Sequence, residues 1–191
     1  DSSGSRGVQI HNRYDQDLLK ASIQEALHFS VSGVVVVEGF VSGLEFGAQT
    51  MSLGGKCTNV LIHSDHMDGS GRIPLTHRYP HPTFTKEQLM KFEYQIALAV
   101  DAIGIQYGPA NVDCIVDAND NVHIIEIGAR VGSTCLPELS SIYSGCDWIN
   151  LSMGISSGKD FDYSRVNNLK NMSSTNCFGG ILTVESDMSP T

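Results

Sequence analysis

Two acidic residues, Asp113 and Glu126, lie in neighbouring stretches whose composition predicts a β-hairpin. Residues 112–116 and 122–127 are rich in β-branched side chains, and a polar cluster at residues 117–121 separates them. If the turn is centred in that cluster, the two carboxylates face each other on one side of the hairpin, with Cβ atoms roughly 5 Å apart. The sequence therefore places two negative charges side by side.

The predicted register follows from a turn centred on Asn119 and Asp120. It pairs Asp113 with Glu126, Asp117 with Val122, and Ile115 with Ile124. The acidic pair then has apolar neighbours on its own face. A three-residue turn would shift this register by one residue and separate the two carboxylates.

Like charges directly opposite each other destabilise a sheet, and on a half-buried face the cost is greater. A cation between the two carboxylates, or a proton on one of them, relieves it. Mg2+ favours carboxylates together with substrate phosphates, so the pair Asp113 and Glu126 predicts a magnesium site. This stretch has two alternative interpretations. The pair could lie by chance on a solvent-facing edge, whereas a calcium loop is excluded because Val122 and Gly128 replace its glycine and its final glutamate.

Composition limits the classes of function. The chain has 191 residues, 41% of them hydrophobic, which is enough for one domain or two lobes with a real core. A formal charge of −9 argues against nonspecific binding to nucleic acid or to an anionic membrane. Neither a membrane-spanning run nor a secretory leader is evident. The five cysteines form no CxxC pair and indicate reduced thiols, so we expect a cytoplasmic protein.

The remaining elements follow from periodicity and from capping signals. Asp15 or Asp17 should cap a helix that ends near residue 29, and Thr85 with Gln88 forms a capping box for a helix that ends at Gly104. Two prolines make residues 76–82 irregular. Further helices are expected at residues 137–144 and 147–154, and strands at residues 8–10, 34–38, 45–51, 60–62 and 180–184.

The run of residues 34–38 predicts a strand that is buried on both faces and ends in Glu38. The backbone of Gly39 to Val41 could imitate the edge of a base pair and recognise adenine, and Glu45 could accept hydrogen bonds from ribose hydroxyls. The alternative is an ordinary connection between strands with surface glutamates.

Two further sites concern phosphate. Residues 1–7 are rich in serine and glycine, and backbone N–H groups around Ser5 and Arg6 could bind phosphate; a cloning scar or a disordered terminus is the alternative. Arg130 follows Glu126 by four residues. Its guanidinium could bind phosphate or carboxylate, or it could form a salt bridge with a neighbouring acid.

Taken together, these segments resemble the ATP-grasp superfamily of ligases, in particular the branch with the carbamoyl-phosphate synthase large subunit and biotin carboxylase. Asp-Ser-Ser-Gly-Ser-Arg-Gly-Val resembles the family's phosphate loop, and Val-Val-Val-Val-Glu-Gly-Phe-Val-Ser-Gly-Leu-Glu resembles its adenine hinge, with Glu45 at the ribose position. Asp113 and Glu126 match the two carboxylates that hold magnesium on ATP. The resemblance spans nearly the whole chain.

The resemblance implies an α+β ATP-grasp fold, with antiparallel sheets, flanking helices and a nucleotide between two lobes. It implies ATP and Mg2+ as cofactors, and small-molecule carboxylate and amine substrates that react through an acyl phosphate, with Arg130 stabilising the transferred group. Residues 1–191 would be a partial ATP-grasp domain, since the family's amino-terminal domain and its lysine-bearing strand would precede Asp1. We therefore expect the chain alone to be inactive and to bind ATP weakly or not at all.

One departure concerns the metal site. The family usually has asparagine two residues after the second metal carboxylate, and this chain has Gly128. That loss of a ligand leaves open a degenerate nucleotide-binding module without ligase activity. A structural metal-binding domain without nucleotide is a third possibility.

Overall fold

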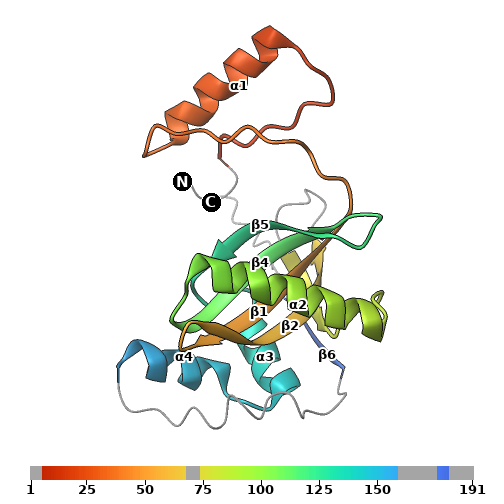
Figure 1. Cartoon of the computed structure of the whole chain (residues 1–191), viewed down its shortest axis with the longest axis vertical. Helices are drawn as coiled ribbons and strands as arrows, with labels where there is room; N and C mark the ends of the chain where they lie inside the picture. The colour runs from red at the N-terminus through yellow and green to blue at the C-terminus, as the bar shows by residue number, and fades with distance from the viewer. Residues whose placement is uncertain (1–5, 68–73, 159–175, 181–191) are drawn as a thin grey trace, which may run out of the picture. The chain divides into compact units, whose positions relative to one another are not determined.

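The computed structural model describes residues 6–67, 74–158 and 176–180 (Figure 1). The chain divides into two compact units, Asp1–Val41 and Ser42–Thr191. Three of the expected elements lie in the smaller unit, and all of the others lie in the larger one.

The smaller unit contains one helix, α1 (Gln16–Phe29), which confirms the predicted helix. Asp15 is its N-cap, and its side chain accepts hydrogen bonds from the backbone N–H groups of Asp17 and Leu18. The strands predicted at residues 8–10 and 34–38 are wrong, because both stretches are irregular. A strand forms only beside a partner, and the described part of this unit offers none. Val34, Val36 and Val37 are consequently exposed rather than buried.

The larger unit is built on one antiparallel sheet with the strand order β5-β4-β1-β2-β3-β6. Its strands are β1 (Leu44–Leu53), β2 (Lys56–Met67), β3 (Pro74–Tyr79), β4 (Tyr107–Val116), β5 (Val122–Gly128) and β6 (Cys177–Gly180). The α+β class is thereby confirmed. The irregular stretch expected at residues 76–82 is partly wrong, because β3 ends before the two prolines and Pro74 is its first residue. Of the strand expected at residues 180–184, Gly180 ends β6 and the other residues lie outside the described part.

One face of the sheet packs against helix α2 (Lys86–Ile103), which lies across it in Figure 1. The predicted capping box is present: Thr85 Oγ1 accepts from the N–H of Gln88, and the Gln88 side chain accepts from the N–H of Thr85. Gly104 ends the helix in the left-handed conformation, with φ 84°. The core on this first face consists of Phe46, Ala48, Ile62, Phe92, Ile96, Val100, Val112, Cys114 and Val116.

The other face, which we call the second face, packs against helices α3 (Leu136–Ser144) and α4 (Trp148–Ser156). Both helices were predicted within two residues of their observed bounds. Trp148 is fully buried beside Met51 and Leu151, and its indole N–H donates to Ser144 Oγ at 2.8 Å. Strand alternation places on this second face the odd-numbered residues of β1 and β4, and those of β2 from Asn59 onward.

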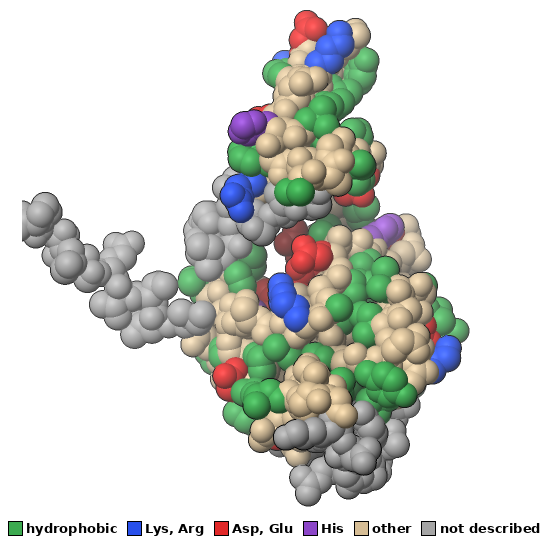
Figure 2. Space-filling view, turned by 90° about the vertical axis from the view of Figure 1, so that its left-hand side faces the viewer, with side chains coloured by type: hydrophobic (Ala, Val, Ile, Leu, Met, Phe, Trp, Pro, Cys, Tyr) green, Lys and Arg blue, Asp and Glu red, His purple; other side chains and the backbone are tan. Residues whose placement is uncertain are grey.

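Apolar side chains also lie on the outside of the molecule, among polar ones (Figure 2). On α2 they include Met90, Tyr94 and Leu98, which are more than half exposed. No helix within the described ranges has the length and apolar character needed to cross a membrane.

The capping box gives a first prediction. Thr85→Ala removes the acceptor for the Gln88 N–H and should lower the free energy of unfolding by about 1 kcal/mol. The matched control is Thr83→Ala, an exposed threonine two residues earlier that caps no helix; it should change stability by less than about 0.5 kcal/mol. Urea unfolding followed by circular dichroism measures both, and equal losses would contradict the assignment of the cap.

Candidate functional site

The β4–β5 hairpin has a three-residue turn rather than the predicted two-residue one. The backbone N–H of Asp117 donates to the carbonyl of Asn121 at 3.0 Å, and Asp120 adopts a positive φ of 59°. Val116 therefore pairs with Val122, and the predicted pairing of Asp117 with Val122 is wrong. The register next to the turn is shifted by one residue.

A β-bulge then reverses this shift. The register changes between Asp113 and Cys114, because Ile125 on β5 has no partner on β4. Beyond the bulge Asp113 pairs directly with Glu126, so the predicted acidic pair is confirmed by a route that the sequence did not reveal. The two carboxylates lie opposite each other on neighbouring strands.

The bulge also changes the surroundings of the pair. Ile124 pairs with Cys114 and packs into the core beneath α2, so the prediction that it faces Ile115 on the acidic side is wrong. His123 takes that place opposite Ile115. The carboxylates project from the second face, with Asp113 half-buried and Glu126 exposed.

A row of facing residues crosses four strands at the level of the acidic pair. Asp113 pairs with Gly47 on β1, and Gly47 pairs with His63 on β2. A Cβ atom on Gly47 would lie 2.2 Å from Cε1 of His63, far inside van der Waals contact. The absence of a side chain at position 47 therefore lets the imidazole of His63 lie across β1 toward Asp113.

Burial raises the pKa of Asp113 above its ordinary value, and the negative charges of Asp65 and Glu126 raise it further. The hydrogen bond from Asn111 Nδ2, at 3.0 Å, and the charge of His63 act in the opposite direction without cancelling the rise. The negative charge of ionised Asp113 is therefore not balanced by the positive charge and hydrogen bonding around it. A cation near the two carboxylates would lower this electrostatic cost.

A chain of hydrogen bonds links Asp113 to the loop that follows β5. The N–H of Gly132 donates to Gln49 Oε1 at 2.8 Å, Gln49 Nε2 donates to Asn111 Oδ1 at 2.5 Å, and Asn111 Nδ2 donates to Asp113. Gln49 is fully buried, so it must satisfy both ends of its amide within the protein. This relay connects the loop after β5 to the carboxylate on β4.

Two other predicted residues lie on the larger unit. Glu45 is exposed, pairs with Ile115, and belongs to the same face as Asp113. Arg130 is also exposed, and its Nη1 donates to the carbonyl of Val131 at 2.9 Å. The proposed salt bridge of Arg130 is absent from the described residues, and its guanidinium lies beside Gly128, 3.8 Å from where a Cβ atom would stand.

The other predicted residues belong to the smaller unit. Glu38 and Gly39 are exposed and Val41 is half-buried, in an irregular segment instead of at the end of a buried strand. Arg6 is exposed in a turn, and Ser5 lies outside the described residues. The nucleotide-binding roles of these residues remain predictions.

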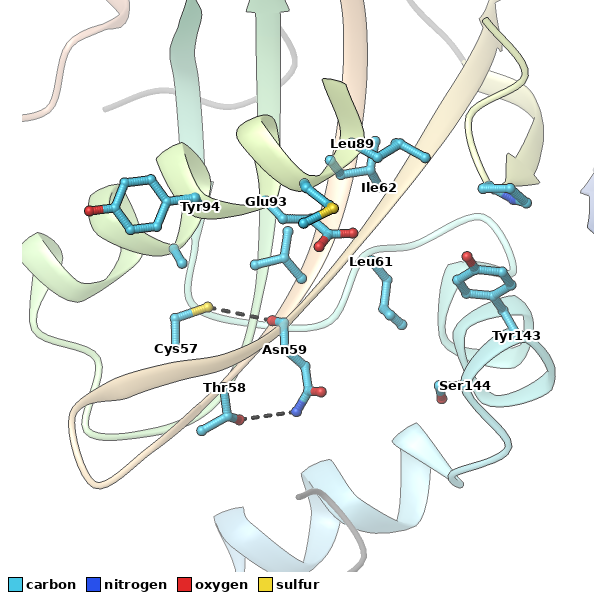
Figure 3. Close-up of a pocket in the computed structure, with 14 residues that line it drawn as sticks. Cys57, Thr58, Asn59, Leu61, Ile62, Leu89, Glu93, Tyr94, Tyr143 and Ser144 are labelled. Carbon is cyan, nitrogen blue, oxygen red and sulfur yellow. Dashed lines mark hydrogen bonds between the residues drawn. The ribbon is translucent and has the colours of Figure 1, made fainter. Parts of the chain in front are cut away.

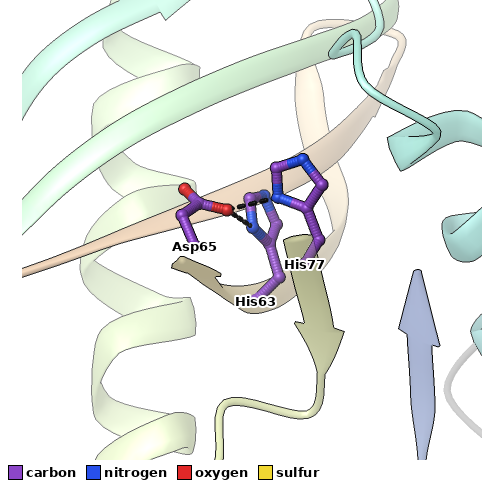
Figure 4. Close-up of side chains that lie close together, drawn as sticks. All are labelled: His63, Asp65 and His77. Atoms are coloured by element: carbon purple, nitrogen blue, oxygen red, sulfur yellow. Dashed lines mark hydrogen bonds and ion pairs between the residues drawn. The ribbon is translucent and has the colours of Figure 1, made fainter. Parts of the chain in front are cut away.

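The structure adds a cluster that sequence reasoning missed. Asp65 Oδ1 lies 2.8 Å from Nδ1 of His63 and 2.5 Å from Nδ1 of His77, so one carboxylate oxygen bridges two imidazoles (Figure 4). His63 and Asp65 are two residues apart on β2, and His77 pairs with Asp65 from β3. The spacing of His63 and Asp65 was a usable signal, but the pairing with β3 could not be seen because that stretch had been predicted to be irregular.

A groove lies elsewhere, between β2, α2 and α3 (Figure 3). It has a volume of about 590 Å3, and its lining includes Leu61, Leu89 and Tyr143, with Glu93 as its carboxylate. None of the predicted site residues lines it, so its size alone does not identify it as the functional site.

Two of the cysteines lie in surroundings that disfavour the thiolate. Burial raises the pKa of Cys57 to about 11 and that of Cys114 to about 12. These two thiols stay protonated at neutral pH.

The chain has the ATP-grasp fold: comparison with solved structures finds this fold over most of the chain's length. An L-amino acid ligase from Bacillus licheniformis matches with a TM-score of 0.68 and 21% identity over 91% of this chain and 42% of the ligase. Phosphoribosylglycinamide synthetase from Anaerococcus prevotii matches with a TM-score of 0.63 and 25% identity, over 86% of this chain and 40% of that one.

Among proteins with this fold, the chain is similar to carbamoyl-phosphate synthase and to biotin carboxylase. The carbamoyl phosphate synthase large chain of Clostridium acetobutylicum is 28% identical over 167 residues, which are 82% of this chain and 14% of that protein. The biotin carboxylase domain of Hydrogenobacter thermophilus 2-oxoglutarate carboxylase, solved with MgADP, ADP and bicarbonate, matches with a TM-score of 0.63 and 20% identity over 87% of this chain and 37% of that domain. No family model matches the sequence.

The raised pKa of Asp113 gives a second prediction. Since the folded state holds this proton more tightly than the unfolded state, stability is lost as the pH rises from the ordinary value of 3.8 through the folded pKa. Asp113→Asn keeps an acceptor for Asn111 and removes the charge. Without Mg2+ it should raise the free energy of unfolding at pH 7 by about 1 kcal/mol, with little effect at acid pH.

Asp117→Asn on the same hairpin is the control with opposite sign. A backbone hydrogen bond from Asn121 and a hydrogen bond from His123 hold the pKa of Asp117 well below its usual range. This substitution should therefore destabilise the chain at pH 7 and lose its effect as the pH falls below about 4. Urea unfolding across pH values measures both variants, and a loss of stability in Asp113→Asn at pH 7 would contradict the electrostatic account.

Proposed function

We propose that this chain carries the magnesium and ATP-phosphate site of an ATP-dependent ligase that joins a small carboxylic acid to an amine through an acyl phosphate. Asp113 and Glu126 are the magnesium ligands, and Arg130 stabilises the transferred phosphoryl group or the acyl phosphate. Glu38, Gly39 and Val41 would bind adenine, Glu45 the ribose, and Ser5 and Arg6 the phosphates. The intact protein would be a cytoplasmic enzyme.

One observation carries the proposal: Asp113 and Glu126 face each other across β4 and β5 in a chain with the ATP-grasp fold. Without a cation between them, the two carboxylates at this position lower the stability of the fold, since burial and neighbouring carboxylates raise the pKa of Asp113. A divalent cation removes that cost. The donor set of two carboxylates suits Mg2+, which Asp113 and Glu126 would hold together with phosphate oxygens of the substrate.

Each residue of the proposed site would have a separate role in the reaction. Bound Mg2+ would supply charge stabilisation to the phosphate oxygens during transfer to the substrate carboxylate. Asp113 and Glu126 would fix its position, and Asn111 would orient Asp113 through its hydrogen bond. Arg130 is exposed beside Gly128, where its guanidinium is accessible to an anionic group. No protein nucleophile is required, since such reactions depend on positioning and electrostatics.

The chain spans 14% of the carbamoyl phosphate synthase large chain, so the whole protein's reaction belongs to the proposal as well. We propose that residues 1–191 are a partial ATP-grasp domain, and that a preceding domain supplies the first ATP-binding lysine. The chemical class of substrates, a small carboxylate and an amine, rests on the fold and on the resemblance.

Gly128 favours a second candidate function. A chain with one metal ligand fewer than the family's usual set could bind nucleotide and Mg2+ without transferring phosphate. Such a degenerate nucleotide-binding module would share the acidic pair but would release no ADP during turnover.

The third prediction concerns binding of magnesium and ATP. At Mg-ATP ten times above the dissociation constant, binding to the native state adds about 1.4 kcal/mol, which should raise the thermal midpoint of the chain by about 3–6 °C. Asp113→Asn and Glu126→Gln should each abolish the rise. Asp117→Asn, on the same hairpin, should retain it. Differential scanning calorimetry with Mg-ATP, with Mg2+ alone and with ATP plus EDTA measures the response, and a rise that survives in both acidic-pair variants would contradict the site.

The fourth prediction concerns the missing ligand. A Cβ atom on Gly128 would have no neighbour nearer than 3.8 Å, so a side chain fits there without displacing Arg130. Gly128→Asn adds an amide oxygen two residues after Glu126 and should tighten Mg-ATP binding by up to about tenfold, or about 1.4 kcal/mol. Gly128→Ala fills the same space without a ligand atom and should leave the affinity unchanged. Isothermal titration calorimetry compares them, and equal effects of Asn and Ala would show that position 128 does not face the metal.

A further inference from the structure

We propose that His63, Asp65 and His77 form a second cation site, selective for a divalent transition-metal ion of the zinc type and separate from the acidic pair. One nitrogen of each imidazole and one oxygen of Asp65 all lie within 4.8 Å of one another. The two elements that carry these residues, β2 and β3, are paired strands of the same sheet. Figure 4 shows the three side chains converging from these strands.

The position of each ligand is fixed by the fold. Asp65 and His77 pair directly across the strands, and His63 lies two residues before Asp65 on the same face. Gly47 makes room for the His63 ring, because any side chain there would collide with it. The ring of His77 meets that of His63 edge-on, with centroids 5.3 Å apart. The cluster is therefore held before any ion binds, which lowers the ordering cost of binding.

Asp65 presents one carboxylate oxygen to both imidazoles of this cluster. A carboxylate flanked by two imidazoles supplies one hard oxygen ligand and two nitrogen ligands of intermediate softness. This donor set suits zinc and similar transition metals better than magnesium, which prefers oxygen ligands alone.

Hydrogen bonding within the chain does not account for all the polar atoms of the cluster. The imidazoles are nearly fully buried, with 1% of His63 and 2% of His77 exposed. Their Nδ1 atoms share Asp65, while Nε2 of each ring has no hydrogen-bond partner within the described part of the chain. Two unsatisfied buried imidazole nitrogens in one place are costly, and such atoms commonly mark a place where an ion binds. Coordination would offset that cost.

The neighbouring charges also favour a dication. Asp113 pairs with Gly47 across β4 and β1, and Gly47 pairs with His63, so a further carboxylate lies near the cluster. One compact ion shared by three ligands distributes its charge over the carboxylate and both rings.

Cobalt is the probe for this site, since Co2+ takes zinc ligands and absorbs visible light when bound with few ligands. The chain is first stripped with EDTA and then titrated with Co2+ in millimolar Mg2+, which occupies the acidic pair but competes poorly for imidazole. The expected result is a visible absorption band that saturates at one equivalent and is displaced by Zn2+. Asp65→Asn and His77→Gln should each weaken Co2+ binding by at least about tenfold.

Three controls make the result decisive. His66→Gln changes an exposed histidine on the same strand and should bind Co2+ like the unmodified chain. Asp113→Asn should also retain the band, which separates this site from the magnesium site whatever the outcome of the Mg-ATP experiment. Circular dichroism confirms folding, and Asp65→Asn provides the test at a partly exposed position if His77→Gln fails to fold. A band that never saturates, a sulfur-to-cobalt charge-transfer band, or equal affinity in Asp65→Asn would each overturn the proposal.

Discussion

The site depends on two carboxylates being held opposite each other although they repel. A sheet normally avoids this arrangement, and here the bulge at Ile125 imposes it by realigning β5 with β4 after a turn that would otherwise have separated Asp113 from Glu126. Between the bulge and the turn, Val122 and Ile124 must pack into the core beneath α2. This requirement fixes how β5 aligns with β4. Hydrophobic burial on one face of the sheet thus holds two like charges opposite each other on the other face.

The two faces of the sheet consequently contribute differently. The face against α2 is almost entirely apolar and supplies much of the stability of the larger unit. On the second face, α3 and α4 cover the apolar part. The same face also has a polar row that runs from Glu126 through Asp113 and Gly47 to His63. The metal chemistry that we propose is confined to this row. A rigid apolar layer directly beneath it keeps the ligands in place.

Much of the fold followed from local signals in the sequence. The capping box of Thr85 and the stop at Gly104 could be predicted, because each depends on nearby residues. The facing of Asp113 with Glu126 was predicted from a two-residue turn that the chain does not have, and the bulge at Ile125 restores it. The irregular structure of residues 34–38 could not be predicted, because strand formation depends on a partner that composition does not reveal. The bulge was hidden for a similar reason: its presence is decided by packing of Ile124 against α2, not by the hairpin itself. The cluster around Asp65 needed the pairing of β2 with β3, which prolines nearby had obscured.

The glycines of the second face differ in how freely they can be replaced during evolution. Position 47 admits no side chain because of His63, and position 132 is closed by Leu136, Asn111 and Gln49, all within 2.8 Å of a Cβ atom. Position 128 is open. A lineage could therefore change the side chain there by a few nucleotide changes without passing through an unfolded ancestor. Under the magnesium site that we propose, the number of ligands becomes an adjustable trait, and divergence between active ligases and inactive nucleotide binders can begin at that one position.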